Sequence, residues 1–306
     1  MSSQWLAAWF YFYEREIEMN VLSSSISQRV ESFFPNVALD RLYGPDMQET
    51  HHYGLRRLDD NSYFGPAVRE HFTMHTKDDV VALAEAVVPI FGEITDVQLG
   101  WTNGHFMSIQ PQRELAIEAT KNDTVFPRVI VTAEYGRAFT ATLGMYRSVC
   151  TNLSIFRSMS EFTVKMRHTS GLRSKMKDLI EDFHILAKGR DNLEATIKQM
   201  VNREVQLAEF LAEIYPAPVE SASDKSKTMH TRRIGKIVRR IQNERASLGI
   251  NNPDLHTVTG WEAYNAVQGY IQHDARRRGN PGTFDRAIKA LSDPKVAHAQ
   301  HVALTL

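Results

Sequence analysis

Apolar residues recur with a helical period in the first half of the chain. Across residues 77–88 they stand three or four positions apart, which predicts a helix with one buried face. Thr76 and Asp79 at its start resemble a capping box, with Asp in place of the usual Glu. Pro89 follows and is expected to end the helix, because proline has no backbone N–H to donate.

Two pairs of segments alternate instead with the two-residue period of a β-strand. Residues 95–101 and 104–110 flank an Asn-Gly dipeptide, which favours tight hairpin turns. Residues 128–134 and 138–149 lie on either side of a second short turn. Residues 20–70 are rich in turn formers and predict only short pieces. The first half is therefore expected to be an α+β unit with a small antiparallel sheet.

The second half has a helical pattern. Its apolar residues step by three and four over about six heptads, a period typical of a helix that packs along a partner. This stripe consists of Leu172, Met176, Leu179, Phe183, Leu186, Leu193, Ile197, Met200, Leu207, Leu211 and Ile214. Gly189 and Asp191 mark a point where a helical hairpin could form. Thr259 and Glu262 form a capping box that opens a later helix. Packing in the core of one chain is favoured over the alternative, a coiled coil that joins a homo-oligomer.

These patterns divide the chain into three parts. Residues 1–19 are interpreted as an N-terminal extension, 20–168 as an α+β core with antiparallel hairpins, and 169–306 as a helical region packed on that core. A linker containing Pro and Ser is expected near 216–224. The predicted fold class is α+β: a small antiparallel sheet with helices, followed by a mainly helical C-terminal half.

Composition narrows the class of protein. Of the 306 residues, 42% are hydrophobic and 24% charged, which is ordinary for a globular domain. The apolar segment 5–13 is too short to cross a bilayer, and no other segment reaches the roughly 20 apolar residues that a membrane helix needs. The single cysteine, Cys150, cannot form an internal disulfide, which fits a reducing compartment. We expect a cytoplasmic protein without a membrane partner.

Charge is divided unevenly along the chain. Residues 1–150 hold 12 basic and 19 acidic side chains, and residues 151–306 hold 24 and 17, so the two halves carry −7 and +7. This asymmetry suggests that the second half faces an anion. The alternative is that the two halves neutralise each other.

The strongest basic run spans residues 225–245, in which Glu244 is the one acid. Apolar residues at helical spacing in this run predict a helix that buries one face and presents a basic one. Cations along such a face neutralise phosphates and release counterions. The candidate phosphate-binding residues are Arg232, Arg233, Lys236, Arg239 and Arg240. A solvated face that only balances the acidic half is the alternative.

Smaller basic groups accompany this run. Arg276 and Arg277 follow a predicted helix, and Lys165 and Arg167 lie just beyond the Cys150 segment. Arg147 precedes that segment. Single strands are held by cations along the backbone and by aromatic rings that stack on bases, so these five residues are further candidates for nucleic-acid binding.

Motifs for catalysis are largely missing. The sequence contains no phosphate-binding GxxxxGK[ST] loop, no GxSxG elbow and no HExxH. His71 and His75 have the spacing of metal ligands but lack an evident third ligand. Cys150 is interpreted as a small buried residue rather than a nucleophile. We expect no cofactor, no metal and no catalytic residue, and lean towards a protein without enzymatic activity.

Two motifs carry a family resemblance. A predicted strand ends in Arg-x-x-Cys-x-Asn, and a downstream helix holds a Trp, a Tyr-Asn-Ala-Val element and then a His followed by basic residues. On these motifs the chain resembles, from about Tyr63 to Ala303, a phage- and plasmid-borne family of uncharacterised proteins, the domain of unknown function number 932. The family-motif residues are Arg147, Cys150, Asn152, Trp261, Asn265 and His273. Their structural interpretation is that they tie the sheet to the helices by buried hydrogen bonds.

The resemblance implies a setting but no reaction. Together with the basic run it predicts a non-enzymatic nucleic-acid-binding protein of a phage or plasmid, located in the host cytoplasm if phage-encoded. Single-stranded DNA is the favoured partner, bound or annealed in replication or recombination, and the expected plan is analogous to that of phage single-strand annealing proteins. The alternative is a protein-binding modulator of host defence or host machinery. A metal-dependent nuclease is a third possibility.

Overall fold

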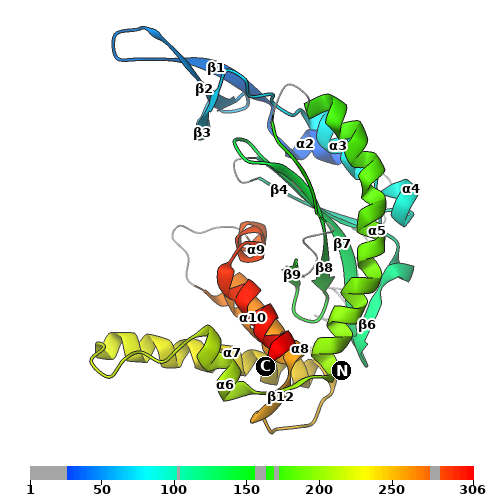
Figure 1. The fold of residues 1–306 in the computed structure, drawn as a ribbon, viewed down its shortest axis with the longest axis vertical. Coiled ribbons are helices and arrows are strands. Elements are labelled where there is room, and N and C mark those ends of the chain that lie inside the picture. Colours follow the sequence, from blue (N-terminus) through cyan, green and yellow to red (C-terminus); the bar gives the residue numbers. More distant parts are fainter. Residues whose placement is uncertain (1–25, 102–103, 156–162, 169–171, 276–282) are drawn as a thin grey trace, which may run out of the picture. The chain divides into compact units, whose positions relative to one another are not determined.

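The computed structural model describes residues 26–101, 104–155, 163–168, 172–275 and 283–306 (Figure 1). The chain folds into two compact units that interleave along the sequence. Unit 1 comprises the described residues up to Arg113 together with Val129–Ala141 and Val164–Ala187. Unit 2 comprises Glu114–Arg128, Thr142–Thr163 and Lys188–Leu306. The sequence predicted a boundary between the α+β core and the helical region at residues 168 and 169, and another after residue 19.

A three-stranded antiparallel sheet lies in unit 1. Strand β1 (Val37–Tyr43) pairs with β2 (Glu49–Arg57), and β2 pairs with β3 (Tyr63–Arg69). Leu55 and Val68 of this sheet form a small core with Tyr135. The sheet occupies the stretch whose many turn formers predicted only short pieces, because its strands bury only part of their side chains and so show a weak apolar period.

The helices that precede the second sheet along the chain lie in unit 1. They are α2 (Ile26–Phe33), α3 (Lys77–Glu85) and α4 (Val88–Phe91). The predicted capping box is confirmed: the Asp79 N–H donates to the Thr76 hydroxyl at 3.3 Å, and the Thr76 N–H donates to the Asp79 carboxylate at 2.7 Å. Pro89 does not end a helix but lies in the first turn of α4, where its missing N–H costs nothing.

The larger sheet has seven strands among the described residues. They are β4 (Asp96–Trp101), β5 (Gly104–Gln110), β6 (Ile117–Thr120), β7 (Asp123–Glu134), β8 (Phe139–Arg147), β9 (Asn152–Ser154) and β10 (Thr163–Met166). Their order is β10-β8-β7-β5-β4, with β6 beside β7 and β9 beside β8. A short 3-10 turn, η2 (Arg113–Leu115), precedes β6. Both predicted hairpins are present, since β4 pairs with β5 and β7 neighbours β8.

The predicted fold class is nevertheless wrong. The sequence predicted one small antiparallel sheet, whereas the described residues form a seven-stranded sheet and a separate three-stranded sheet, and two further short strands lie within the helical half. Short strands such as β6, β9 and β10 carry too few residues for an apolar period. Their existence depends on pairing with β7 and β8, which only tertiary structure supplies.

Helices dominate the chain beyond residue 172. They are α5 (Leu172–Asn202), α6 (Leu207–Ile214), α7 (Asp224–Leu248), α8 (Gly260–Gly269), the π-helical turn η4 (Tyr270–Asp274), α9 (Thr283–Leu291) and α10 (Pro294–Thr305). Two short strands, β11 (Glu204–Gln206) and β12 (Thr257–Thr259), pair with each other. The capping box at Thr259 is confirmed and opens α8. Almost every residue of α8 is buried, so this helix forms the core of unit 2.

The apolar stripe of the second half is divided between elements. Helix α5 runs through Gly189 without a break, so the suggested hairpin at that point does not form, and the stripe resumes in α6 after β11. Where the structure describes its side chains, the stripe is buried within the chain, as at Ile197 and Leu211. This favours packing inside one chain; the predicted homo-oligomer stays a prediction.

None of the helices that the structure describes is both long and apolar enough to span a bilayer.

Candidate functional site

Helix α7 has a buried apolar side and an exposed basic side. Ser223 caps its first turn by accepting from the Ser226 N–H, and Gly249, with φ of 72°, ends it in the left-handed region that glycine tolerates. Ile237 and Ile241 are fully buried on one side. The apolar period that predicted this helix therefore also determines which residues it presents outward.

The outward side of α7 borders a cavity of about 410 Å³. Six α7 residues, at successive spacings of three and one, share this side: Lys236, Arg239, Arg240, Asn243, Glu244 and Ser247. The opposite wall comes from Val149 and Cys150 in the turn between β8 and β9, and from Asp274 at the end of η4. All of these residues belong to unit 2, so the cavity lies within one compact body.

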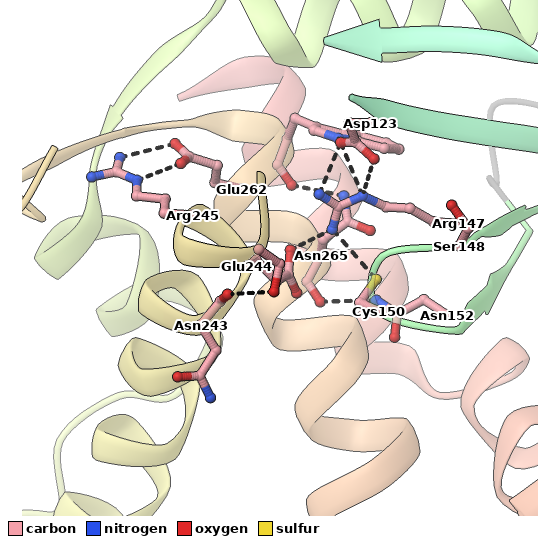
Figure 2. Close-up of polar contacts among 12 residues, drawn as sticks. Asp123, Arg147, Ser148, Cys150, Asn152, Asn243, Glu244, Arg245, Glu262 and Asn265 are labelled. Carbon is pink, nitrogen blue, oxygen red and sulfur yellow. Dashed lines mark hydrogen bonds and ion pairs between the residues drawn. The ribbon is translucent and has the colours of Figure 1, made fainter. Parts of the chain in front are cut away.

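Arg147 is a buried arginine that contacts the Cys150 sulfur. Figure 2 shows Arg147 between Asp123 and Glu244. Its Nε donates to both Asp123 oxygens at 2.8 and 3.0 Å, and its Nη2 donates to Asp123 at 2.8 Å. Its Nη1 donates to Glu244. The guanidinium also lies 5.5 Å from the Trp261 ring centroid, and the Trp261 indole donates to Asp123 at 2.8 Å.

This cluster holds two carboxylates against one guanidinium. Arg147 and Asp123 are each 1% exposed, so neither is available to bind phosphate on the surface. Although burial disfavours the charge of Arg147, its neighbours Cys150, Glu244 and Asp123 raise its pKa well above the ordinary value. Arg147 is thus a fixed internal cation, which differs from the role in nucleic-acid binding that the sequence suggested.

Glu244 is the incompletely satisfied member of the cluster. One of its oxygens accepts from Arg147, while the other, Oε1, is buried and makes no hydrogen bond to any residue that the structure describes. Burial raises the pKa of Glu244, and the charge and hydrogen bond of Arg147 oppose this shift. Buried polar groups are almost always hydrogen-bonded, so an open acceptor at the edge of a cavity needs an explanation.

Cys150 lies between Arg147 and the cavity. Its sulfur accepts from Arg147 Nη1 at 3.3 Å, and burial raises the thiol pKa to about 11. The next residue, Thr151, has φ of 53°, a left-handed conformation that is uncommon for a β-branched residue. The protonated thiol therefore lines the cavity and makes a weak polar contact, and it is not activated as a nucleophile.

Two glutamines hold this turn against α8 and η4. The Gln272 amide donates to the Thr151 carbonyl at 3.1 Å and accepts from the Leu153 N–H at 3.1 Å. Gln268 donates to the Leu153 carbonyl at 2.8 Å. These contacts connect η4 to the turn at Thr151. The geometry of η4 is π-helical, a form that is rare and often found at functional sites.

The family-motif amides and His273 extend the same network. Asn152 donates to the Asn265 carbonyl at 3.1 Å, and Asn265 donates to the Trp261 carbonyl at 2.9 Å. His273 Nε2 lies 3.2 Å from Asn152 Oδ1, and burial, followed by Arg240, lowers the pKa of His273. These contacts are the internal ties that the sequence offered as the structural interpretation of the motifs.

The model of a family described as Domain of unknown function (DUF932) matches residues 67–294, about three quarters of the chain. The chain belongs to this family. The matched range contains every residue of the cavity and of the Arg147 cluster. No curated protein and no solved structure matches the chain.

Arg240 is held by an ion pair at the rim of the cavity beside α7. Its Nε donates to Asp274 at 2.6 Å. A Cβ added at Gly269 would lie 2.7 Å from Arg240 Nη1 and 3.2 Å from Asn152 Oδ1, so glycine at this position allows the guanidinium to approach the helix closely. Arg240 is therefore a positioned group with its charge already paired.

The other predicted binding residues are divided between the two units. Arg232, Lys236 and Arg239 are exposed on α7, whereas Arg233 lies 4.9 Å from the Tyr215 ring centroid. Lys165 on β10 and the nearby Arg167 are exposed in unit 1. Arg276 and Arg277 lie outside the described residues. The structure thus groups Lys236, Arg239 and Arg240 around one cavity.

Several residues of the site were missed from sequence. Asp123 lies 24 positions from its partner Arg147, and no local pattern connects them. Gln268, Gln272 and Asp274 carry no motif. Glu244 did carry a signal: it is the one acid in the basic run and falls on the same helical side as Lys236 and Arg240. A lone acid on an otherwise basic face marks a specific internal partner.

A second buried polar cluster lies in unit 1, beside a cavity of about 450 Å³. His75 Nε2 and His105 Nδ1 are 2.8 Å apart, both rings are buried, and His75 stacks on Tyr135. Burial lowers the pKa of His105 to about 3 and that of His75 well below its ordinary value, so both imidazoles are neutral. In the described part of the chain, no group of three His, Cys, Asp or Glu residues has the geometry of a metal site.

Proposed function

We propose that the chain is a non-enzymatic nucleic-acid-binding protein that holds single-stranded DNA along the basic side of α7. The observation that carries the proposal is the group of exposed cations on this helix, of which Lys236 and Arg239 border the cavity. Neither makes an ion pair with a residue that the structure describes. Free cations on a rigid helix favour a polyanion, since each phosphate contact releases counterions.

The length of the basic side of α7 suits a ligand with several phosphates in succession. Exposed cations run from Lys225 to Arg239, a distance of about 20 Å along a helix that rises 1.5 Å per residue. A strand following this line meets several cations in succession. The cavity beside the line admits an unstacked nucleotide, which a single strand offers and a duplex does not. An origin in a phage or plasmid, with a role in replication or recombination, belongs to the same proposal.

A salt titration tests it. Fluorescence anisotropy of labelled single-stranded and duplex oligonucleotides is measured from about 50 mM salt upward. We expect binding that favours the single strand and weakens steeply with salt. No binding to either DNA at about 50 mM would overturn the proposal, and cleavage of the oligonucleotide in magnesium would overturn its non-enzymatic part.

A pair of charge-matched variants locates the binding surface. Replacing Arg232, Lys236 and Arg239 by Gln should reduce the salt slope by up to about 2, since each single-strand phosphate contact contributes roughly 0.7. The control replaces Lys188, Lys198 and Lys289, which are exposed elsewhere in unit 2, and should leave the slope unchanged. Equal slopes in both variants would show that α7 is only a solvated face.

A further inference from the structure

We infer that the cavity beside α7 is a subsite for one nucleotide whose base carries an amino group. The ligand places its phosphate at Lys236 and Arg239 and donates a hydrogen bond from the base amino group to Glu244. This inference rests on the proposed function for the origin of the nucleotide, but the cavity chemistry can be tested with free nucleotides.

The acceptor is the first element of the subsite. Glu244 is 8% exposed, lines the cavity, and keeps Oε1 without a partner among the described residues. Leaving a buried charged acceptor open is costly, and a ligand N–H removes that cost on binding. A bare phosphate has no such donor and would meet an anion at this end of the cavity.

The cations form the other end. Lys236 and Arg239 precede Glu244 by eight and five residues, which separates them by about 12 and 7.5 Å along the helix axis. A nucleoside monophosphate spans this separation from its phosphate to the amino group of its base. The cavity of about 410 Å³ lies within the range of small-molecule sites.

The remaining wall suits the ring of the base. Val149 supplies an apolar contact and Cys150 a weakly polar one, while Gln272 holds the turn that carries them. Arg240 is already paired with Asp274, so it shapes the rim without requiring a second phosphate. Asn243 and Ser247 are exposed at the cavity edge and offer hydrogen bonds to the sugar.

Two nearly isosteric nucleotides isolate the role of Glu244. Deoxycytidine monophosphate carries an amino group where deoxyuridine monophosphate carries a carbonyl oxygen, which a carboxylate repels. Isothermal titration calorimetry should find the cytidine nucleotide bound at least about tenfold more tightly, as expected for a hydrogen bond to a charged group. In Glu244→Gln the preference should fall to about twofold, because an amide both accepts and donates.

A control variant and two results that would overturn the inference complete the experiment. Glu209→Gln makes the same change on the exposed side of α6, outside the cavity, and should keep the preference. Equal affinity of wild type for the two nucleotides, or no binding of either at millimolar concentration, would overturn the inference. The wild-type comparison needs no variant, so a failure of Glu244→Gln to fold leaves the inference testable.

Oligonucleotides that begin with 5′-phosphorylated dC or dU distinguish the two sources of the nucleotide. Preference for the dC strand assigns the cavity to a strand end, and preference confined to free nucleotides assigns it to a mononucleotide. If strands bind with a steep salt slope but neither they nor free nucleotides show discrimination, the inference fails while the proposed function stands. If free nucleotides discriminate and strands do not bind, the proposed function fails alone.

Discussion

Glu244 and Arg245 are adjacent on α7 but belong to two very different buried clusters. Arg245 donates to both Glu262 oxygens and to the carbonyls of Asn252 and Asp254, and Glu262 also caps α8. The Arg245 guanidinium and both Glu262 oxygens all have hydrogen-bond partners. The cluster of Glu244 instead holds two carboxylates around Arg147 and leaves one oxygen open.

The difference separates a structural ion pair from a candidate binding site. The Arg245 cluster joins α7 to the loop before β12 and to the start of α8, and none of its residues lines the cavity beside α7. The Arg147 cluster is more deeply buried, and its Glu244 lines that cavity. The open oxygen of Glu244 therefore distinguishes the two clusters.

Among the variants that compare the two clusters, removal of Arg147 should lower the free energy of unfolding most. In Arg147→Gln both Asp123 and Glu244 remain buried without their cation, so we expect a loss of at least about 3–5 kcal/mol in the free energy of unfolding. Urea titration followed by circular dichroism measures it. Arg190→Gln, which removes a partly exposed ion pair with Glu194, should cost about 0.5 kcal/mol. Similar losses in the two variants would contradict the assignment of a buried cluster.

Removing Arg245 should have the next largest effect. Arg245→Gln leaves Glu262 and two loop carbonyls without their donor, but Glu262 keeps the Thr259 N–H, so we expect a loss of about 3 kcal/mol. The same urea titration applies. Nucleotide binding by the folded variant should not change, because Arg245 does not line the cavity. A loss of binding without a loss of stability would contradict the structural role.

Replacing the two glutamates should give opposite dependences on pH. The pKa of Glu244 is raised by burial, so wild type loses stability as pH rises from the ordinary value of 4.5 through the raised value, and Glu244→Gln does not. The variant should therefore gain stability relative to wild type towards pH 8.

The pKa of Glu262 behaves in the other direction: burial opposes the shift, but Arg245 and the Thr259 N–H lower it overall. Glu262→Gln should therefore be less stable than wild type at neutral pH, and this deficit should shrink as pH falls below 4.5. Thermal unfolding of the three proteins across pH measures both trends. Parallel profiles for the two variants would refute the distinction between the clusters.

The smallest effect concerns the turn beside the Arg147 cluster. Thr151→Gly relieves a left-handed conformation that costs an L-residue about 1–2 kcal/mol, less the entropy that glycine loses on folding. We expect a net gain of about 0.5–1 kcal/mol in urea titration. Thr196→Gly at a half-buried position of α5 should instead lose about 0.3–0.5 kcal/mol. A loss in both variants would indicate that the Thr151 side chain is itself required.

Local features of this fold could be predicted, and distant ones could not. The capping boxes at Thr76 and Thr259 and the apolar face of α7 depend on residues within one or two turns, so sequence alone defines them. The extent of the sheets depends on strands such as β6 and β9, which exist only through their neighbours. The error in fold class follows from that dependence.

The same distinction applies to the site. The basic side of α7 was predicted because its cations are close in sequence. The role of Arg147 could not be predicted, because both of its carboxylate partners are far away along the chain, Asp123 by 24 residues and Glu244 by 97. The local sequence around a basic residue at a strand end does not show whether that residue binds phosphate or is enclosed by carboxylates. Cys150 was expected to be a small buried residue; it is partly exposed and lines a cavity, a position that no pattern in the sequence indicates.

The two sides of α7 have a consequence for how this protein can change over time. Its buried side rests on Ile237 and Ile241, while Lys236, Arg239, Asn243 and Ser247 are exposed around the cavity. Substitutions at these four exposed positions leave the core untouched and cost little stability. Single substitutions on one helix can therefore change the lining of the cavity while Arg147 and its carboxylates beneath it stay in place.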